Sequence, residues 1–288
     1  MSIRDQQNPF FGHLHLTGAP WDKPARHLFE DRVAAAAEAG ATGIGFGAEE
    51  LDQLVGTRSP AELRGILDHH GQHIGELEVL MGWHLDGPEA EGPRAVEKRM
   101  YALAGMFGTA RIKASAVFVP ATAMPPLDLL VERFAALCDR AAAHGVVISL
   151  EPLSVFPGFD YPTAAEVVQR ADKANGGLLI DSWHFFRDPG AFAALDKLSG
   201  RHINAFELVD GAAEPKVSRL EDCVDHRLLP GEGDFDLARL VRLLDDKQVD
   251  VTLSVEVLSA ELRALPLREN LSRTVTAVRT FLEALPLR

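Results

Sequence analysis

Short apolar runs alternate with helix-like segments along the whole chain, and this alternation constrains the fold more than any other feature of the sequence. Eight runs have the length and aliphatic content of strands: 12–16, 42–46, 73–80, 110–116, 146–151, 178–181, 203–209 and 251–256. Helical patterns follow these runs at about 24–39, from 59 onward, and at 93–107, 126–143, 163–174, 189–198, 236–246 and 269–285. Such alternation is typical of parallel strands that are joined by crossover helices.

Eight strand–helix units in one chain of 288 residues predict an α/β fold, a closed (β/α)8 TIM barrel. A barrel of this kind needs roughly 250 residues. The first strand–helix junction lacks a G-x-G-x-x-G turn, which argues against an open dinucleotide-binding sheet. No low-complexity linker or charge block divides the sequence. We therefore predict a single barrel domain over residues 1–288.

Local signals mark several helix ends. Ser59 is followed by Pro60 and, three residues after the serine, by Glu62. This pattern predicts a helix with serine as its N-cap and proline in its first turn. Gly40 and Gly108 follow two other helical patterns and are expected to end them.

The charge balance excludes some classes of partner. The chain carries 42 acidic against 29 basic residues, a formal net charge of −13, which argues against binding to nucleic acid or to an anionic membrane. Cys138 and Cys223 are too few for a disulfide framework or a thiolate zinc site. The N-terminal residues form no signal-peptide core, and no apolar run is long enough to span a bilayer. We expect a soluble, cytoplasmic protein.

Acidic residues stand at the ends of the last four predicted strands. They are Glu151, Asp181, Glu207 and Glu256. A TIM barrel has its active site at the carboxyl ends of the strands, so these side chains are expected to converge. Converging carboxylates repel one another unless a cation lies among them, and oxygen ligands favour Mg²⁺ or Mn²⁺ over zinc. The alternative interpretation is that these acids are separate and solvated. The presence of one acid on each of four consecutive strands makes this alternative less favourable.

The segments around these acids resemble a known family. Ser149–Pro152 (SLEP), Ile180–His184 (IDSWH), Leu229–Asp234 (LPGEGD) and Ser254–Val257 (SVEV) are similar to motifs of the sugar phosphate isomerase/epimerase family, the xylose isomerase-like barrels. That family includes ketose 3-epimerases, hydroxypyruvate isomerase, inosose dehydratase and 3-dehydroshikimate dehydratase. The resemblance covers nearly the whole chain, with the motifs in the family's order.

The resemblance implies one divalent metal ion, Mn²⁺ or Mg²⁺ in the first place, with Co²⁺ or Zn²⁺ as alternatives. Family members hold it with Glu, Asp, His or Gln, and Glu on strands five to eight. The implied ligands here are Glu151, Asp181, Glu207 and Glu256. Glu207 departs from the family pattern, because four carboxylates around one dication leave a formal charge of −2. Either Lys113, Arg227 or a protonated His184 compensates, or Glu207 is not a direct ligand.

Several further residues are expected to bind substrate: His184, Arg227, Lys113, Glu78, His15 and Trp83. The resemblance implies that His184 and Arg227 face the substrate. Lys113 lies within a strand and points either to a substrate oxyanion or outward between helices. Glu78 shares a strand face with Glu76 and lies nearer the mouth. Trp83 either closes one wall of the pocket or packs on a helix, and His15 lies near the end of the first predicted strand.

A divalent cation that chelates two adjacent oxygens of a hydroxy-ketone stabilises an enediolate. Glu151 and Glu256 are expected to be catalytic together with His184, because two carboxylates can remove and return the proton.

We expect an isomerase or epimerase of a small sugar or keto-polyol. A dehydratase of the 3-dehydroshikimate or inosose type is the main alternative. An AP endonuclease-like nuclease and a non-catalytic barrel are less favoured. The expected partner is a small polyhydroxylated molecule, with homo-oligomerisation as a further possibility.

Overall fold

The computed structural model describes residues 2–118 and 123–286, and its strands form one closed barrel. All neighbouring strands are parallel and follow one another in chain order. The last strand pairs with the first, so the predicted TIM barrel is confirmed. The strands are β1 (Phe10–Phe11), β2 (Ile44–Gly47), β3 (Ile74–Leu80), β4 (Arg111–Ser115), β5 (Val147–Glu151), β6 (Gly176–Asp181), β7 (Ile203–Glu207) and β8 (Leu253–Val255).

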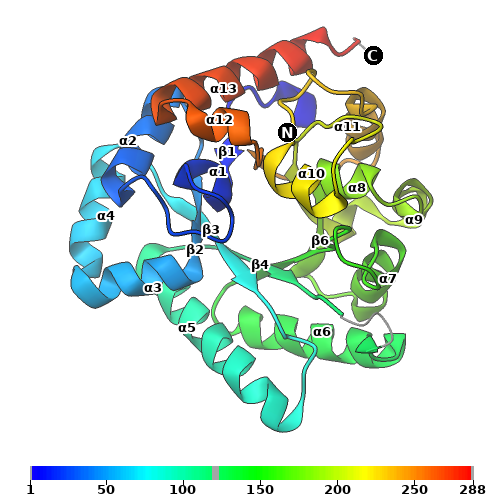
Figure 1. The fold of residues 1–288 in the computed structure, drawn as a ribbon. Coiled ribbons are helices and arrows are strands. Elements are labelled where there is room, and N and C mark those ends of the chain that lie inside the picture. The colour runs from blue at the N-terminus through cyan, green and yellow to red at the C-terminus, as the bar shows by residue number, and fades with distance from the viewer. Residues whose placement is uncertain (1, 119–122, 287–288) are drawn as a thin grey trace.

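Helices form an outer ring around the strands, and the C-terminal helix lies beside α2 (Figure 1). The predicted helices are α2 (Phe29–Ala39), α4 (Pro60–His69), α5 (Glu91–Phe107), α6 (Leu127–Ala142), α7 (Tyr161–Ala171), α9 (Ala191–Lys197), α11 (Leu237–Asp246) and α13 (Leu267–Ala284). Helices that the sequence did not predict are α1 (His13–Thr17), α3 (Ala48–Thr57), α8 (Ser182–Phe186), α10 (Arg219–Asp225) and α12 (Ala260–Ala264). Within the described ranges, no helix has both the length and the apolarity to cross a bilayer.

The predicted cap of α4 is confirmed. The Ser59 side chain accepts a hydrogen bond of 3.2 Å from the Glu62 backbone N–H, and Pro60 occupies the first turn. Gly40 and Gly108 follow α2 and α5 with φ of 83° and 69°, a left-handed conformation that glycine adopts without steric cost.

The prediction for the first strand is wrong. The strand ends at Phe11, and residues from His13 onward form helix α1. The His-Leu-His-Leu alternation has the period of a strand, but the first N–H groups of α1 meet acidic side chains from other strands. Gly12 makes this approach possible, because a Cβ there would lie 2.7 Å from Oε1 of Glu256.

Strand alternation separates an apolar layer from a polar interior. Residues two apart on a strand share a face, so Lys113 and Ser115 of β4 point to the same side. Their neighbours Ile112 and Ala114 are fully buried in the main hydrophobic core. Strand β4 therefore packs one face against the helices and delivers polar groups with the other.

The loop after β7 is organised by one buried carboxylate. Asp210 accepts backbone hydrogen bonds of 2.8 to 3.2 Å from Gly211, Gly231, Gly233 and Phe235. Its own backbone pairs with Leu228 in an antiparallel bridge. These bonds fix the Pro-Gly-Glu-Gly turn. They thereby hold Arg227, the residue before Leu228, at the mouth of the barrel.

Replacing this carboxylate should destabilise the protein strongly. Asp210→Ala leaves four backbone N–H groups without their acceptor, so we expect the free energy of unfolding to fall by about 3 kcal/mol. Urea unfolding followed by circular dichroism measures the change. Asp234→Ala is the matched control, because exposed Asp234 accepts one hydrogen bond among the described residues, from the Ala213 N–H. Equal losses in both variants would contradict the role assigned to Asp210.

Candidate metal and substrate site

A cluster of ionisable side chains fills the barrel interior toward the carboxyl ends of the strands. The side chain of every member is at most 7% exposed, and acids outnumber bases by three to one. The carboxyl groups therefore outnumber the buried cations by four. We call this group the carboxylate cluster; it consists of Glu76, Glu78, Glu151, Asp181, Glu207 and Glu256, with Lys113 and Arg227 as its cations.

Lys113 lies inside the barrel and not between the helices. Its Nζ donates a hydrogen bond of 2.8 Å to Glu207. Oxygens of Glu78, Glu256 and Glu76 lie 3.1, 3.5 and 3.9 Å away. Burial alone would lower the pKa of Lys113, but the surrounding carboxylates raise it well above its usual value. The ammonium group is therefore charged.

Arg227 lies over the other side of the cluster. Its Nη1 donates to Asp181 at 2.7 Å and to the Glu256 carbonyl at 3.1 Å. Its Nη2 lies 3.4 Å from Nε2 of His184. The guanidinium also stacks over Trp183, with 5.3 Å from Cζ to the ring centroid. Two of the predicted compensating cations, Lys113 and Arg227, thus lie within the cluster.

Glu151, Asp181 and His184 form a group that could hold a metal ion. One donor atom from each lies within 4.8 Å of the other two. Asp181 ends β6 and caps α8, accepting the backbone N–H of Trp183 at 2.7 Å. Helix α8 starts at Ser182, directly after Asp181. Its first turn therefore brings the imidazole of His184 close to the carboxylate of Asp181, which caps the helix. Ser154 contacts Nδ1 of His184 at 3.2 Å.

The cluster shifts its members' pKa values in opposite directions. Burial, with repulsion from Asp181 and Glu256, raises the pKa of Glu151 to about 8. Burial acts against ionisation of Asp181 and Glu256 as well, but Arg227 and Lys113 hold their pKa values below the usual range. Burial lowers the pKa of His184 to about 3, so its ring is neutral.

These residues fit a divalent cation. Oε2 of Glu207 is buried without a hydrogen-bond partner among the described residues, while Oε1 contacts Lys113. A buried carboxylate oxygen with no donor is costly unless a cation or water satisfies it. The excess of acids over buried bases likewise calls for a further positive charge in the cluster. A divalent ion supplies both the missing partner and the missing charge.

The N-terminal residues of α1 also contact the cluster, which the sequence did not indicate. The His13 N–H donates to Glu78 at 2.8 Å, and the Leu14 N–H donates to Glu256 at 3.0 Å. Backbone donors carry no signal in residue type. Gly12 was the available clue, because a glycine before a polar segment permits close approach.

Two predicted substrate-binding residues lie elsewhere. His15 makes its ring contacts with Val257 and with Thr274 of α13, at 3.2 and 3.3 Å, so both nitrogens are engaged by the protein itself. Trp83 packs edge-on against Phe134 and Phe159, with centroids 5.7 and 6.4 Å away. For Trp83 the sequence left two possibilities, closing a wall of the pocket or packing on a helix. The contact with Phe134, which belongs to α6, agrees with the second.

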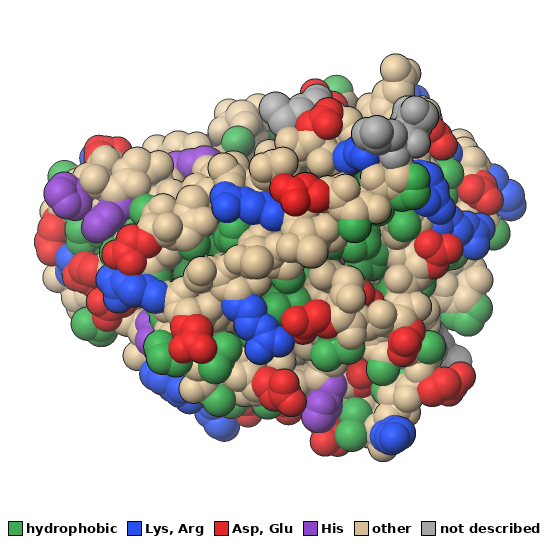
Figure 2. Space-filling view, turned by 90° about the horizontal axis from the view of Figure 1, so that it is seen from above, with side chains coloured by type: hydrophobic (Ala, Val, Ile, Leu, Met, Phe, Trp, Pro, Cys, Tyr) green, Lys and Arg blue, Asp and Glu red, His purple; other side chains and the backbone are tan. Residues whose placement is uncertain are grey.

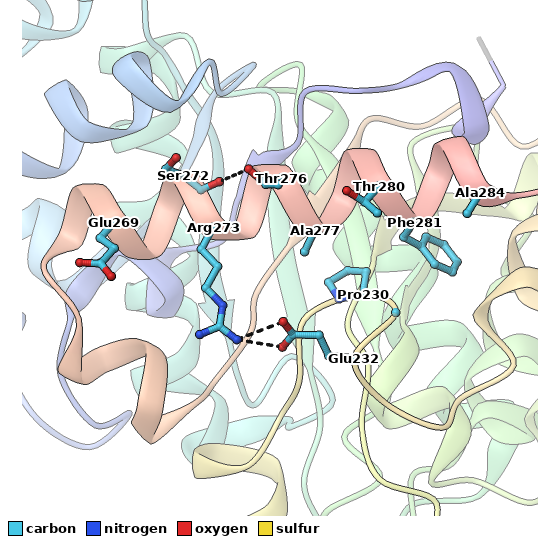
Figure 3. Close-up of a pocket in the computed structure, with 11 residues that line it drawn as sticks. Pro230, Glu232, Glu269, Ser272, Arg273, Thr276, Ala277, Thr280, Phe281 and Ala284 are labelled. Atoms are coloured by element: carbon cyan, nitrogen blue, oxygen red, sulfur yellow. Dashed lines mark hydrogen bonds and ion pairs between the residues drawn. The ribbon is translucent and has the colours of Figure 1, made fainter.

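The outer surface has a separate groove of about 610 Å³ between α13 and the turn at 230–232 (Figure 3). Figure 3 shows Arg273 forming two hydrogen bonds to Glu232 across it. No member of the carboxylate cluster lines this groove. On the face drawn in Figure 2, Lys and Arg side chains are interspersed with Asp and Glu and form no separate basic patch.

Comparison with known proteins agrees with the family resemblance. The model of a family described as "Xylose isomerase-like TIM barrel" matches residues 33–280. A 3-dehydroshikimate dehydratase of Pseudomonas aeruginosa is 33% identical over 153 residues, which cover 53% of this chain and 24% of that protein. An inosose isomerase of Bacillus licheniformis is 29% identical over 147 residues, 49% of this chain and 50% of that protein. The matches thus span about a quarter and a half of these relatives.

Solved structures share the fold at lower sequence identity. The structure of an IOLI protein with a bound zinc atom has a TM-score of 0.79 and 18% identity, covering 98% of this chain and all of that one. At this identity the likeness concerns the fold.

Removing single carboxylates should abolish metal binding. We expect about one divalent ion per chain in the parent protein, and little or none in Asp181→Asn or Glu256→Gln, because each loses a charged ligand. Elemental analysis by mass spectrometry after gel filtration measures the content. Glu232→Gln, which alters an acid of the outer groove, should bind as the parent does. Full metal content in both cluster variants would refute this site.

Metal affinity should rise with pH. The pKa of Glu151 is about 8 in the metal-free protein, so below that pH a bound cation must displace its proton. We expect the Mn²⁺ affinity to increase up to about tenfold per unit from pH 6 to pH 8 and then to level off. Isothermal titration calorimetry in buffers of different ionisation heat measures both affinity and proton release. A constant affinity without proton release would contradict a protonated Glu151.

Proposed function

The chain belongs to the xylose isomerase-like TIM barrel family, and from this premise we propose that it is a divalent-metal-dependent isomerase or epimerase of a small sugar or keto-polyol. One observation carries the proposal: carboxylates from consecutive strands converge in a buried cluster whose charge the protein's own cations do not neutralise. The inosose isomerase relative has a name that fits this reaction class.

We assign one ion, Mn²⁺ or Mg²⁺, to four ligands: Glu151, Asp181, Glu207 and Glu256. Oxygen ligands of this kind would suit a hard divalent cation. When bound, the ion withdraws charge from a carbonyl and acidifies the adjacent C–H group. The Oε2 of Glu207, which has no hydrogen-bond partner among the described residues, supports this set. So does the proximity of Glu151 to Asp181, which lie in one group with His184.

Glu151 and Glu256 are assigned the proton transfers. They come from β5 and from the residue after β8, and their pKa values are shifted in opposite directions. Glu256, which is ionised, can accept the proton next to the carbonyl. Glu151 is assigned the return of a proton to the substrate. Pairs of acids whose environments separate their pKa values are suited to such paired acid and base roles.

His184 and Arg227 are assigned to the substrate's oxygen atoms. The neutral His184 ring lies between Ser154 and Arg227, and Arg227 is anchored on Asp181. Both groups therefore have fixed positions beside the proposed ion. Hydrogen-bonding groups of this kind suit a polyhydroxylated molecule, and the acidic neighbours of the pocket disfavour an anionic polymer.

A metal-dependent dehydratase is the second candidate. The relative with the highest identity given above is a 3-dehydroshikimate dehydratase. Proton removal beside a carbonyl gives dehydration when a β-hydroxyl leaves, so the same acid–base pair serves both reactions. Glu207 in place of the family's usual His or Gln also favours this alternative.

Solvent exchange distinguishes these reactions. We expect the protein with Mn²⁺ in D₂O to place deuterium next to the carbonyl of one compound from a panel of ketoses, inososes and 3-dehydroshikimate. Proton NMR detects the exchange, and a new isomer or a new C=C bond identifies the outcome. Glu151→Gln and Glu256→Gln should slow exchange by about 10²-fold or more.

Two further variants complete this experiment. Glu166→Gln, on the exposed face of α7, should exchange at the parental rate. His184→Gln should keep its ion and lose exchange; loss of the ion instead would make His184 a ligand. A metal-loaded protein that exchanges no member of the panel contradicts the proposed function.

A further inference from the structure

The innermost part of the carboxylate cluster already contains a cation. The Lys113 side chain enters the barrel from β4, and its ammonium group lies among four carboxylates. Two come from β3, one from β7 and one from the end of β8: Glu76, Glu78, Glu207 and Glu256. One oxygen from each lies within 4.0 Å of Nζ. We call this place the inner position.

Carboxylate oxygens already surround the ammonium group. Its Nζ donates a hydrogen bond of 2.8 Å to Glu207, and oxygens of Glu78 and Glu256 lie 3.1 and 3.5 Å away. The side chain is only 2% exposed, so little of the ammonium group is open to a substrate. The geometry therefore argues for a charge-compensating role.

Glu207 lies between the inner position and Asp181 of the neighbouring strand β6. Its Oε1 accepts from Lys113, whereas its buried Oε2 has no hydrogen-bond partner among the described residues. Glu207 also pairs in register with Asp181 of β6. One carboxylate thus faces Lys113 with one oxygen and keeps the other for a second cation.

We propose that the barrel interior has two adjacent cation positions, and that Lys113 permanently fills the inner one. The outer position, at Glu151 and Asp181, is the metal site on which the proposed function rests. Removing the ammonium group turns the inner position into a second site for a divalent cation. Its ligands are then hard oxygen atoms, which suit Mn²⁺ or Mg²⁺.

This arrangement limits the chain to one metal ion. Two ions about 3.5–4 Å apart are the arrangement that serves hydrolysis of phosphate esters. A tethered ammonium group supplies positive charge at the inner position, but it offers no open coordination site and cannot activate water. Lys113 thereby keeps a strongly acidic interior from acquiring two-metal chemistry.

The test counts Mn²⁺ ions in variants of Lys113. Each protein is equilibrated with Mn²⁺, passed through gel filtration and measured by elemental mass spectrometry. Lys113→Ala, which removes the ammonium group and makes room, should bind one ion more than the parent. Lys113→Arg keeps the positive charge and should match the parent. The double variant Lys113→Ala/Glu78→Gln, which loses an inner ligand, should lose the additional ion or bind it at least tenfold more weakly.

Folding provides a second readout. Lys113→Ala leaves four carboxylates without their cation, so we expect a lower melting temperature without metal and a larger increase with Mn²⁺ than in the parent. Circular dichroism records both. An equal ion count in Lys113→Ala and the parent would overturn the proposal, as would a variant that stays unfolded at every Mn²⁺ concentration.

The outcomes separate this inference from the proposed function. If the parent binds no ion and Lys113→Ala binds one, the outer metal site is refuted and the inner position stands. If both bind one ion, the outer site stands and the inner position is refuted.

Discussion

The buried charge of the barrel interior is the constraint on which the rest of the structure depends. Six carboxylates share this space with two cations, and charges in a low-dielectric interior are tolerated only when they are paired. Lys113 and Arg227 meet part of this requirement from opposite sides. Lys113 draws together acids from β3, β7 and β8, and Arg227 holds Asp181. The raised pKa of Glu151 and the Oε2 of Glu207, which has no hydrogen-bond partner among the described residues, mark the places that these two cations leave uncompensated.

The barrel makes this concentration of charge possible because parallel strands end at the same mouth. Strand alternation sends Ile112 and Ala114 into the apolar layer and Lys113 into the interior. Helix α1 contributes in a different way, since its first N–H groups bind Glu78 and Glu256. A strand in its place would have offered no such donors.

Residues outside the cluster hold its polar groups in place. Arg227 stacks on Trp183, whose Nε1 donates to Asp222, and Asp222 also pairs with Arg187. The loop that carries Arg227 is fixed through Asp210 and the glycine turn beyond it. These contacts fix the guanidinium that anchors Asp181. A site built this way has its polar atoms positioned before any ligand arrives, which lowers the cost of binding.

The closed barrel could be predicted from the sequence alone. Periodicity and turn residues indicated eight strand–helix units, and the acids at the last four strand ends could be named because parallel strands deliver their final residues to one place. Only the tertiary structure decided which way Lys113 points, that Gly12–Leu16 leaves the strand for α1, and that His15 and Trp83 pack against the protein. Local pattern cannot settle these points, because each depends on contacts with residues far away in the chain. The charge on Lys113, for example, is fixed by carboxylates from three other strands.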